Sequence, residues 1–140
     1  MANKKVMYIG GSWGDAIYFF DRVNKTRIYG FKDPWRNGFA EGSVLFDLAN
    51  NKNNDTIPLY YISDIQYEDD PKDMFFAYID LIGNVENPKG EYAVDWYKPY
   101  IDKVKENLIK KKNETSFFNF SEKRKLKKFI RTLEEMKESK

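Results

Sequence analysis

The chain contains no cysteine and no histidine. Without cysteine it cannot form disulfide bonds, bind zinc through thiolates or use a thiol nucleophile, and this absence is typical of a reducing compartment. Without histidine it lacks the usual general base near neutral pH, the commonest metal ligand and every serine–histidine mechanism. We therefore expect a binding protein rather than an enzyme, with no catalytic residues, no cofactor and no metal ion.

Long apolar runs are missing too. No stretch approaches the ~18 apolar residues that a membrane-spanning helix needs, and the first residues lack the apolar core of a signal peptide. These features predict a cytoplasmic protein without a membrane partner. The length of 140 residues suits one domain, which we expect to comprise residues 1–140.

Aromatic residues make up 17% of the chain, enough to fill a β-rich core or to form a contact surface. Charge is unevenly distributed. Residues 1–92 carry 10 Lys and Arg against 14 Asp and Glu (net −4), and residues 93–140 carry 14 against 8 (net +6). Either the two parts attract each other, or the basic part offers a surface to nucleic acid or another polyanion.

The stretch 56–83 predicts a long β-hairpin at the centre of the fold, joined by a turn at Asp70–Asp73. Apolar residues alternate along both halves, as on strands with one buried face. We expect Phe75, Ile79 and Leu81 to be buried. In the first half, one face carries Ile57, Leu59, Tyr61, Ile65 and Tyr67. Shorter strands are expected within residues 5–9, 17–23, 26–31 and 42–49.

From about residue 93 the apolar spacing changes to three and four, which predicts two amphipathic helices. The first is expected to begin at Lys98 or Pro99, and Ser121 is expected to cap the second. Both need an apolar partner, so we expect them to dock on the β part. The two predicted apolar stripes are Val94, Tyr97, Ile101, Val104 and Leu108, and Leu126, Phe129, Ile130, Leu133 and Met136.

These patterns predict an α+β fold. Residues 1–90 form an N-terminal antiparallel β-sheet or a small SH3-like barrel of five to seven strands, and residues 91–140 form two C-terminal α-helices.

The segment from Lys25 to Gly83 resembles small SH3-like β-barrel proteins of phages and low-GC bacteria. The resemblance is carried by Ile28-Tyr29-Gly30, by Gly42-Ser43-Val44-Leu45 and by the run Asp70-Pro71-Lys72-Asp73-Met74-Phe75-Phe76-Ala77. It implies a barrel and names no activity. The architecture, a β part followed by two helices, is also similar to that of phage sponge proteins, which sequester nucleotide immune signals.

Several aromatic and arginine residues are candidates for contact with a ligand or partner: Trp13, Arg27, Tyr29, Trp35 and Arg36. Such side chains dominate interface hot spots and stack on nucleobases. The alternative is that the tryptophans close the ends of a barrel core. Candidates for contact with a polyanion are Lys123, Arg124, Lys127, Lys128 and Arg131.

Two further motifs have simpler interpretations. The glycine-rich stretch Gly10–Gly14 follows a strand, as phosphate-binding loops do, but a plain turn explains it as well. The carboxylates Glu68, Asp69, Asp70 and Asp73 lack the spacing of a calcium loop and fit a solvated turn.

We therefore expect a non-catalytic binding protein, phage-encoded or carried by a mobile element, that sequesters or inhibits a host protein or a nucleotide-like ligand. It is either a monomer or a homo-oligomer. The alternative is a nucleic-acid-binding protein that uses the basic helices.

Overall fold

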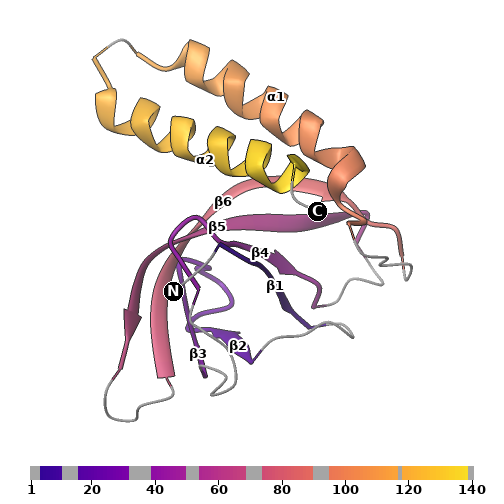
Figure 1. Cartoon of the computed structure of the whole chain (residues 1–140), viewed down its shortest axis with the longest axis vertical. Helices are drawn as coiled ribbons and strands as arrows, with labels where there is room; N and C mark the ends of the chain where they lie inside the picture. The colour runs from indigo at the N-terminus through magenta and orange to yellow at the C-terminus, as the bar shows by residue number, and fades with distance from the viewer. Residues whose placement is uncertain are drawn as a thin grey trace.

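The computed structural model describes residues 4–10, 16–31, 39–49, 54–68, 74–89, 95–116 and 118–138. Within these residues the fold has two layers, a curled six-stranded sheet and a helical hairpin packed on one side of it (Figure 1). The strands are β1 (Val6–Ile9), β2 (Ile17–Phe19), β3 (Arg27–Phe31), β4 (Val44–Asp47), β5 (Thr56–Tyr67) and β6 (Met74–Glu86), and the helices are α1 (Lys98–Glu114) and α2 (Phe120–Glu138). The predicted α+β class is confirmed.

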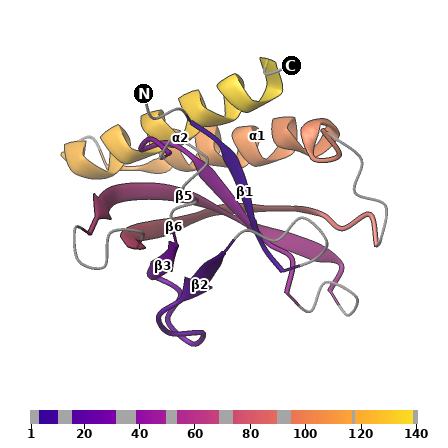
Figure 2. The ribbon, with the colours of Figure 1, turned by 60° about the horizontal axis from the view of Figure 1, so that its bottom comes forward.

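The strands lie in the order β1-β4-β5-β6-β3-β2, and the sheet curls into a half-barrel in which the edge strands β1 and β2 approach each other (Figure 2). Neighbouring strands are antiparallel except β1 and β4, which run parallel with Val6 beside Val44. Parallel neighbours need a crossover connection, and the β2–β3 hairpin lies within it. The predicted antiparallel arrangement therefore holds for every described pair but this one.

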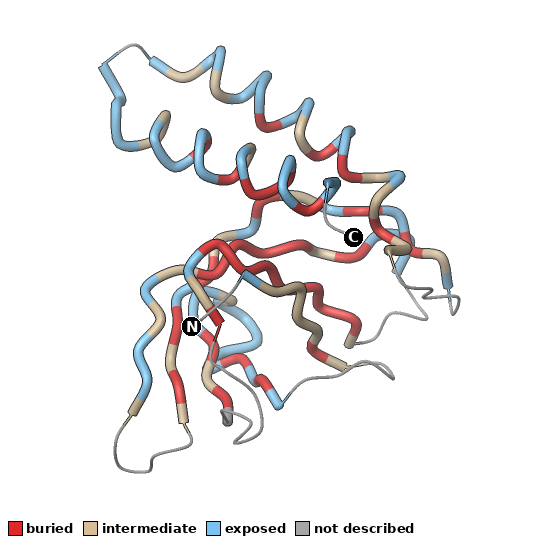
Figure 3. The backbone as a smooth tube through the Cα atoms, viewed as in Figure 1, coloured by how far each residue is buried: buried red, intermediate tan, exposed pale blue. Residues whose placement is uncertain are grey.

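The two faces of the sheet bury separate apolar clusters (Figure 3). The inner core fills the concave side of the half-barrel and comprises Ile9, Ile17, Phe19, Ile28, Phe39, Leu45, Tyr60, Ile62, Phe75, Ala77 and Ile79. The outer core lies between the sheet and the helices. It comprises Val44, Phe46, Leu48, Ile57, Leu59, Tyr61, Ile82 and Val85 from the β part, and Tyr97, Ile101, Val104, Leu108, Leu126, Phe129, Leu133 and Met136 from the helical part.

The β5–β6 hairpin has the two longest strands of the sheet, of 12 and 13 residues, and it occupies the centre as predicted. Phe75 and Ile79 are buried in the inner core, but Leu81 is 57% exposed, so the prediction that Leu81 is buried is wrong. Alternation puts Leu81 on the inner face. However, β3 pairs with β6 only from Met74 to Tyr78, and the wall of the half-barrel ends before Leu81.

The predicted apolar face of β5 is interrupted as well. Ile57, Leu59 and Tyr61 belong to the outer core, whereas Ile65 packs against the inner core. The register of β5 against β6 shifts between Ser63 and Gln66, and Asp64 between them has a φ of 49°. An extra residue in one strand exchanges the faces of every side chain beyond it, which explains why the single predicted face is split.

The helices dock on the β part, as predicted. Phe46 of β4 anchors α1, with ring centroids 4.9 Å from Trp96 and 5.3 Å from Tyr97. Tyr61 of β5 lies 4.9 Å from Phe129 of α2. The described residues of both predicted stripes are buried, apart from the partly buried Ile130, while Val94 lies outside the described residues. No helix in the described part of the chain is both long and apolar enough to cross a membrane.

The helix starts differ in how well they were predicted. Helix α1 begins at Lys98 with Pro99 in its first turn, as expected. Helix α2 begins at Phe120, because the Asn119 side chain accepts a hydrogen bond from the Glu122 backbone N–H at 3.2 Å. The predicted cap at Ser121 is therefore wrong: Ser121 lies inside the first turn and Asn119 is the capping residue.

Candidate functional site

Part of the outer face of the sheet is not covered by the helices. Alternation along β2, β3 and β6 puts aromatic side chains on this face, opposite the buried Ile17, Ile28 and Phe75. Phe20 continues β2 by one residue, since its backbone N–H donates to the Arg27 carbonyl at 3.2 Å. We call the following residues the aromatic surface: Tyr18, Phe20, Arg27, Tyr29, Phe76 and Tyr78.

Strand register brings the rings of the aromatic surface together. Tyr18 pairs with Tyr29, and Tyr29 pairs with Phe76, which makes a row across three adjacent strands. The ring centroids of Tyr18 and Tyr29 are 5.5 Å apart. The Phe20 ring lies 4.9 Å from Tyr29 and 5.6 Å from Phe76. The four rings therefore form one continuous apolar platform.

Arg27 lies over one end of this platform. Its guanidinium carbon is 4.7 Å from the centre of the Phe20 ring, within the range of a cation–π contact. In the sheet register, Arg27 lies beside Tyr78 of β6. Among the described residues, no carboxylate lies within ion-pair distance of Arg27. Its planar face is thus held by a ring, while its N–H donors remain available to an anionic or polar group.

The exposure of these rings is unusual for side chains of their size. Tyr18 is 49% exposed, Phe20 45% and Tyr78 51%. The inner and outer cores are built from other residues, so the fold does not need these rings in order to bury apolar area. Contiguous exposed apolar side chains on a folded protein mark a surface that contacts something else.

The structure brings two predicted contact residues together, Arg27 and Tyr29, which are both part of the aromatic surface. Trp13, Trp35 and Arg36 lie outside the described residues. Sequence reasoning did not select Tyr18, Phe20, Phe76 and Tyr78. The signal was present in the alternation: Tyr18, Phe76 and Tyr78 each lie between two buried residues in the sequence, and Phe20 follows one.

Four of the predicted polyanion residues, Arg124, Lys127, Lys128 and Arg131, are exposed on the side of α2 away from Leu126 and Leu133, whereas Lys123 is half-buried. Two ion pairs with described carboxylates are formed: Lys128 Nζ lies 3.8 Å from Glu41, and Arg131 Nε lies 3.9 Å from Glu135. The full predicted stripe is Lys123, Arg124, Lys127, Lys128 and Arg131.

The remaining motifs do not form a site in the described parts of the chain. Gly10 adopts a positive φ of 76°, and a Cβ added there would lie 3.0 Å from the Ala49 backbone nitrogen, while residues 11–14 lie outside the described residues. Of the four predicted turn carboxylates only Glu68 is described. The described residues contain no group of three or more side chains of the kinds that hold a metal ion.

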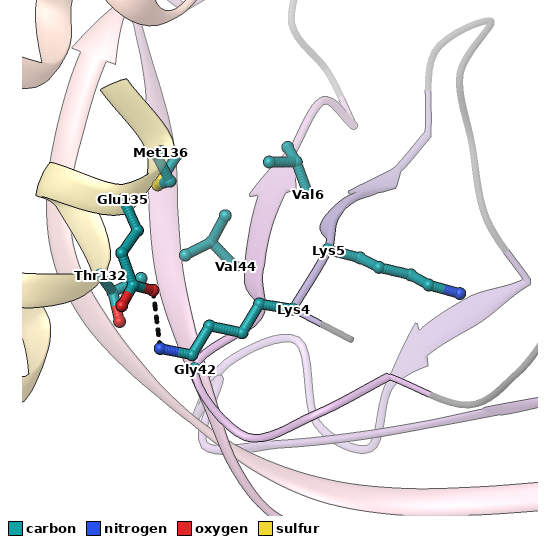
Figure 4. Close-up of a pocket in the computed structure, with 8 residues that line it drawn as sticks. All are labelled: Lys4, Lys5, Val6, Gly42, Val44, Thr132, Glu135 and Met136. Carbon is teal, nitrogen blue, oxygen red and sulfur yellow. Dashed lines mark hydrogen bonds and ion pairs between the residues drawn. The ribbon is translucent and has the colours of Figure 1, made fainter. Parts of the chain in front are cut away.

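A cavity of about 170 Å³ lies between the start of β1 and the last turns of α2 (Figure 4). Lys4 Nζ and Glu135 Oε2 form an ion pair at 2.7 Å, and Val6, Val44 and Met136 provide the apolar lining. Because the two charges neutralise each other, the cavity offers little to a charged ligand. The cavity lies where the end of α2 meets the start of β1.

The aromatic surface is thus the strongest candidate site among the described residues. Comparison with known proteins adds no relative from which a role could be transferred: no protein-family model matches the chain, and no curated protein and no solved structure matches it.

Proposed function

We propose that the protein is a non-catalytic binding protein and that the aromatic surface holds its ligand. The observation that carries the proposal is the row formed by Tyr18, Tyr29 and Phe76 across three strands, with Phe20 and Arg27 beside it. A row of accessible rings, of which Tyr18 is exposed and Tyr29 and Phe76 are half-buried, is pre-organised on a sheet, so little side-chain freedom is lost when a flat ligand stacks on it.

The ligand class that fits is a nucleobase in a nucleotide or a single strand of nucleic acid. Every base has a π-face, and stacking on aromatic side chains is worth about 1–3 kcal/mol per base. Arg27 adds donors that can reach a phosphate or a base edge next to the stacked ring. Duplexes bury their bases, so the surface should discriminate against them.

A protein partner is the second candidate, because Tyr, Phe and Arg together are also typical of interface hot spots. It would agree with the expectation that the protein sequesters or inhibits a host component. A role of the basic stripe on α2 in binding nucleic acid is the third. The three candidates differ in the ligand that binds and in the residues that binding depends on.

The test is fluorescence anisotropy with a labelled oligothymidine, a labelled duplex and a labelled adenine nucleotide. We expect the single strand or the nucleotide to bind at least tenfold more tightly than the duplex. Tyr29→Ala should weaken binding by about tenfold or more, since one stacking contact is lost, whereas Tyr29→Phe should retain it. Leu81→Ala removes an exposed apolar side chain that lies outside the aromatic surface and serves as the control.

Two outcomes would contradict this proposal. If duplex and single strand bind equally and only Arg124→Ala with Lys127→Ala weakens them, the basic stripe is the binding site. If no nucleic acid or nucleotide binds and a protein co-purifies with the wild type but not with Tyr29→Ala, the aromatic surface has a protein partner.

A further inference from the structure

The adjoining ends of α1 and α2 project past the sheet and away from both cores (Figures 1 and 2). The tube in Figure 3 is mostly exposed there. We call this region the hairpin tip; it consists of residues 109–116 and 118–128. The outer core reaches the hairpin tip at Leu108, just before it on α1, and at Leu126, within its last turn on α2.

Two phenylalanines at the hairpin tip are more exposed than any ring of the aromatic surface. Phe118 is 84% exposed and Phe120 is 61% exposed. Phenylalanine has no polar atom that could compensate for contact with water, and neither residue caps α2, because Asn119 between them does so. Both rings therefore present most of their apolar area to solvent.

The same region has a large excess of positive charge. Residues 109–128 contain eight Lys and Arg against two Glu, a net charge of +6. Among the described residues, no carboxylate lies within ion-pair distance of Lys110, Lys111, Lys112, Arg124, Lys125 or Lys127.

The other end of the hairpin is neutralised. There Lys105 pairs with Glu134 at 3.3 Å, and Lys137 pairs with Asp102 at 2.6 Å. Lys4 also pairs with Glu135. Lys105 and Lys137 are thus each paired where the helices lie over the sheet, whereas Lys110, Lys111, Lys112, Arg124, Lys125 and Lys127 have no such partner among the described residues.

Exposed rings beside a cluster of cations, on a protruding end with a large excess of positive charge, are the features of a peripheral membrane contact. We propose that the hairpin tip docks on a lipid bilayer that contains anionic lipids. Phe118 and Phe120 enter the boundary between headgroups and acyl chains, and the surrounding Lys and Arg side chains lie over the anionic headgroups. A bilayer is flat enough to meet both helix ends at once, whereas a single strand of nucleic acid binds along a groove or a face.

This contact does not require a membrane-spanning segment, so it extends beyond the sequence-based expectation of no membrane partner. It is also independent of the aromatic surface, which lies on β2, β3 and β6. Either proposal can fail without the other.

Sedimentation of the full chain with vesicles tests the proposal. We expect binding to phosphatidylcholine vesicles that contain about one third phosphatidylserine, little binding to pure phosphatidylcholine, and weaker binding as salt is raised. Phe118→Ala with Phe120→Ala should reduce binding at least tenfold, because the buried ring area is lost. Lys110→Gln, Lys111→Gln and Lys112→Gln together should abolish the preference for anionic vesicles.

The matched control is Phe20→Ala, which removes an exposed ring from the aromatic surface and should leave vesicle binding unchanged. The thermal midpoint of the double Phe variant should equal that of the wild type, since both rings are exposed. Vesicle binding that is unaffected by the double Phe variant would overturn the proposal. So would absence of binding to anionic vesicles combined with binding of a labelled oligonucleotide that the same variant abolishes.

Discussion

Gly83 of β6 lies so close to Val104 of α1 that a Cβ added to the glycine would be 2.5 Å from the valine Cγ1. Such a distance is far inside van der Waals contact, and Val104 is buried in the outer core. The absence of a side chain at Gly83 therefore sets how closely α1 can approach the sheet.

Gly83→Ala should accordingly lower the free energy of unfolding by about 1–3 kcal/mol, the usual cost of overpacking a well-packed core. The measurement is chemical denaturation of the single variants and of Gly83→Ala with Val104→Ala. The glycine substitution should cost less in the Val104→Ala background, with a coupling of about 0.5–3 kcal/mol. Additive effects of the two substitutions would contradict the contact.

Phe75 and Leu81 should respond very differently to the same truncation, although both lie on the inner face of β6. Phe75→Ala should cost about 3–5 kcal/mol, since its ring is fully buried and lies 4.8 Å from Phe39. Leu81→Ala should change stability by no more than about 0.5 kcal/mol, as for other surface substitutions. Denaturation midpoints at equal m-values provide the comparison. A similar loss for both variants would mean that the half-barrel covers Leu81 in solution.

The comparison of these two residues also shows what the sequence could predict. Period-two alternation identified the β5–β6 hairpin and the burial of Phe75 and Ile79, and three-four spacing identified both helices, because these are local patterns. These local patterns could not show that β3 stops opposite Tyr78, which exposes Leu81. Nor could they show that a bulge near Asp64 turns Ile65 to the inner core. Both depend on pairing between strands that are distant in sequence.

The candidate site was predictable only in part for the same reason. Arg27 and Tyr29 are near each other in sequence, so they were selected together. Phe76 joins them only because β3 pairs with β6, and Tyr18 only because β2 pairs with β3. The parallel pairing of β1 with β4 also joins strands that are distant in sequence, so no local pattern indicates it.

Asn119 should contribute more to the stability of α2 than Ser121. Asn119→Ala removes the hydrogen bond to the Glu122 N–H and should cost about 0.5–2 kcal/mol, whereas Asn119→Asp should retain the cap. Ser121→Ala lies in the first turn and should have almost no effect. Thermal unfolding followed by circular dichroism measures all three. A larger loss of stability for Ser121→Ala than for Asn119→Ala would show that Ser121 is the capping residue, as the sequence predicted.

The protein should lose stability at alkaline pH. Burial, together with Tyr8 and Asp95 nearby, raises the pKa of Tyr97 from 10.0 to about 12. Burial also raises the pKa of Tyr60, Tyr61 and Tyr67. An unfolded chain releases these protons near pH 10, but the folded protein retains them. Rising pH therefore stabilises the unfolded state relative to the folded state. The contribution of Tyr97 is therefore complete below pH 10 and is lost between pH 10 and about 12.

Over that window Tyr97 alone should change the free energy of unfolding by about 1.4 kcal/mol per pH unit. The test is denaturant unfolding of the wild type and of Tyr97→Phe between pH 9 and pH 11.5. The slopes of the two proteins are compared rather than their absolute values, because the two chains differ only at this residue. A slope that is unchanged in Tyr97→Phe would show that the Tyr97 phenol does not cause the loss of stability at alkaline pH.

The β part should not be stable without the helices. A fragment ending at Gly90 would leave Phe46, Leu59 and Tyr61 without their partners Ile101, Val104 and Phe129, and so expose one whole apolar face of the sheet. Exposed apolar faces and sheet edges promote association between chains. We expect this fragment to aggregate or to bind a hydrophobic dye strongly, measured by size-exclusion chromatography and dye fluorescence beside the full chain. A monomeric fragment with cooperative unfolding would show instead that the inner core alone specifies the half-barrel.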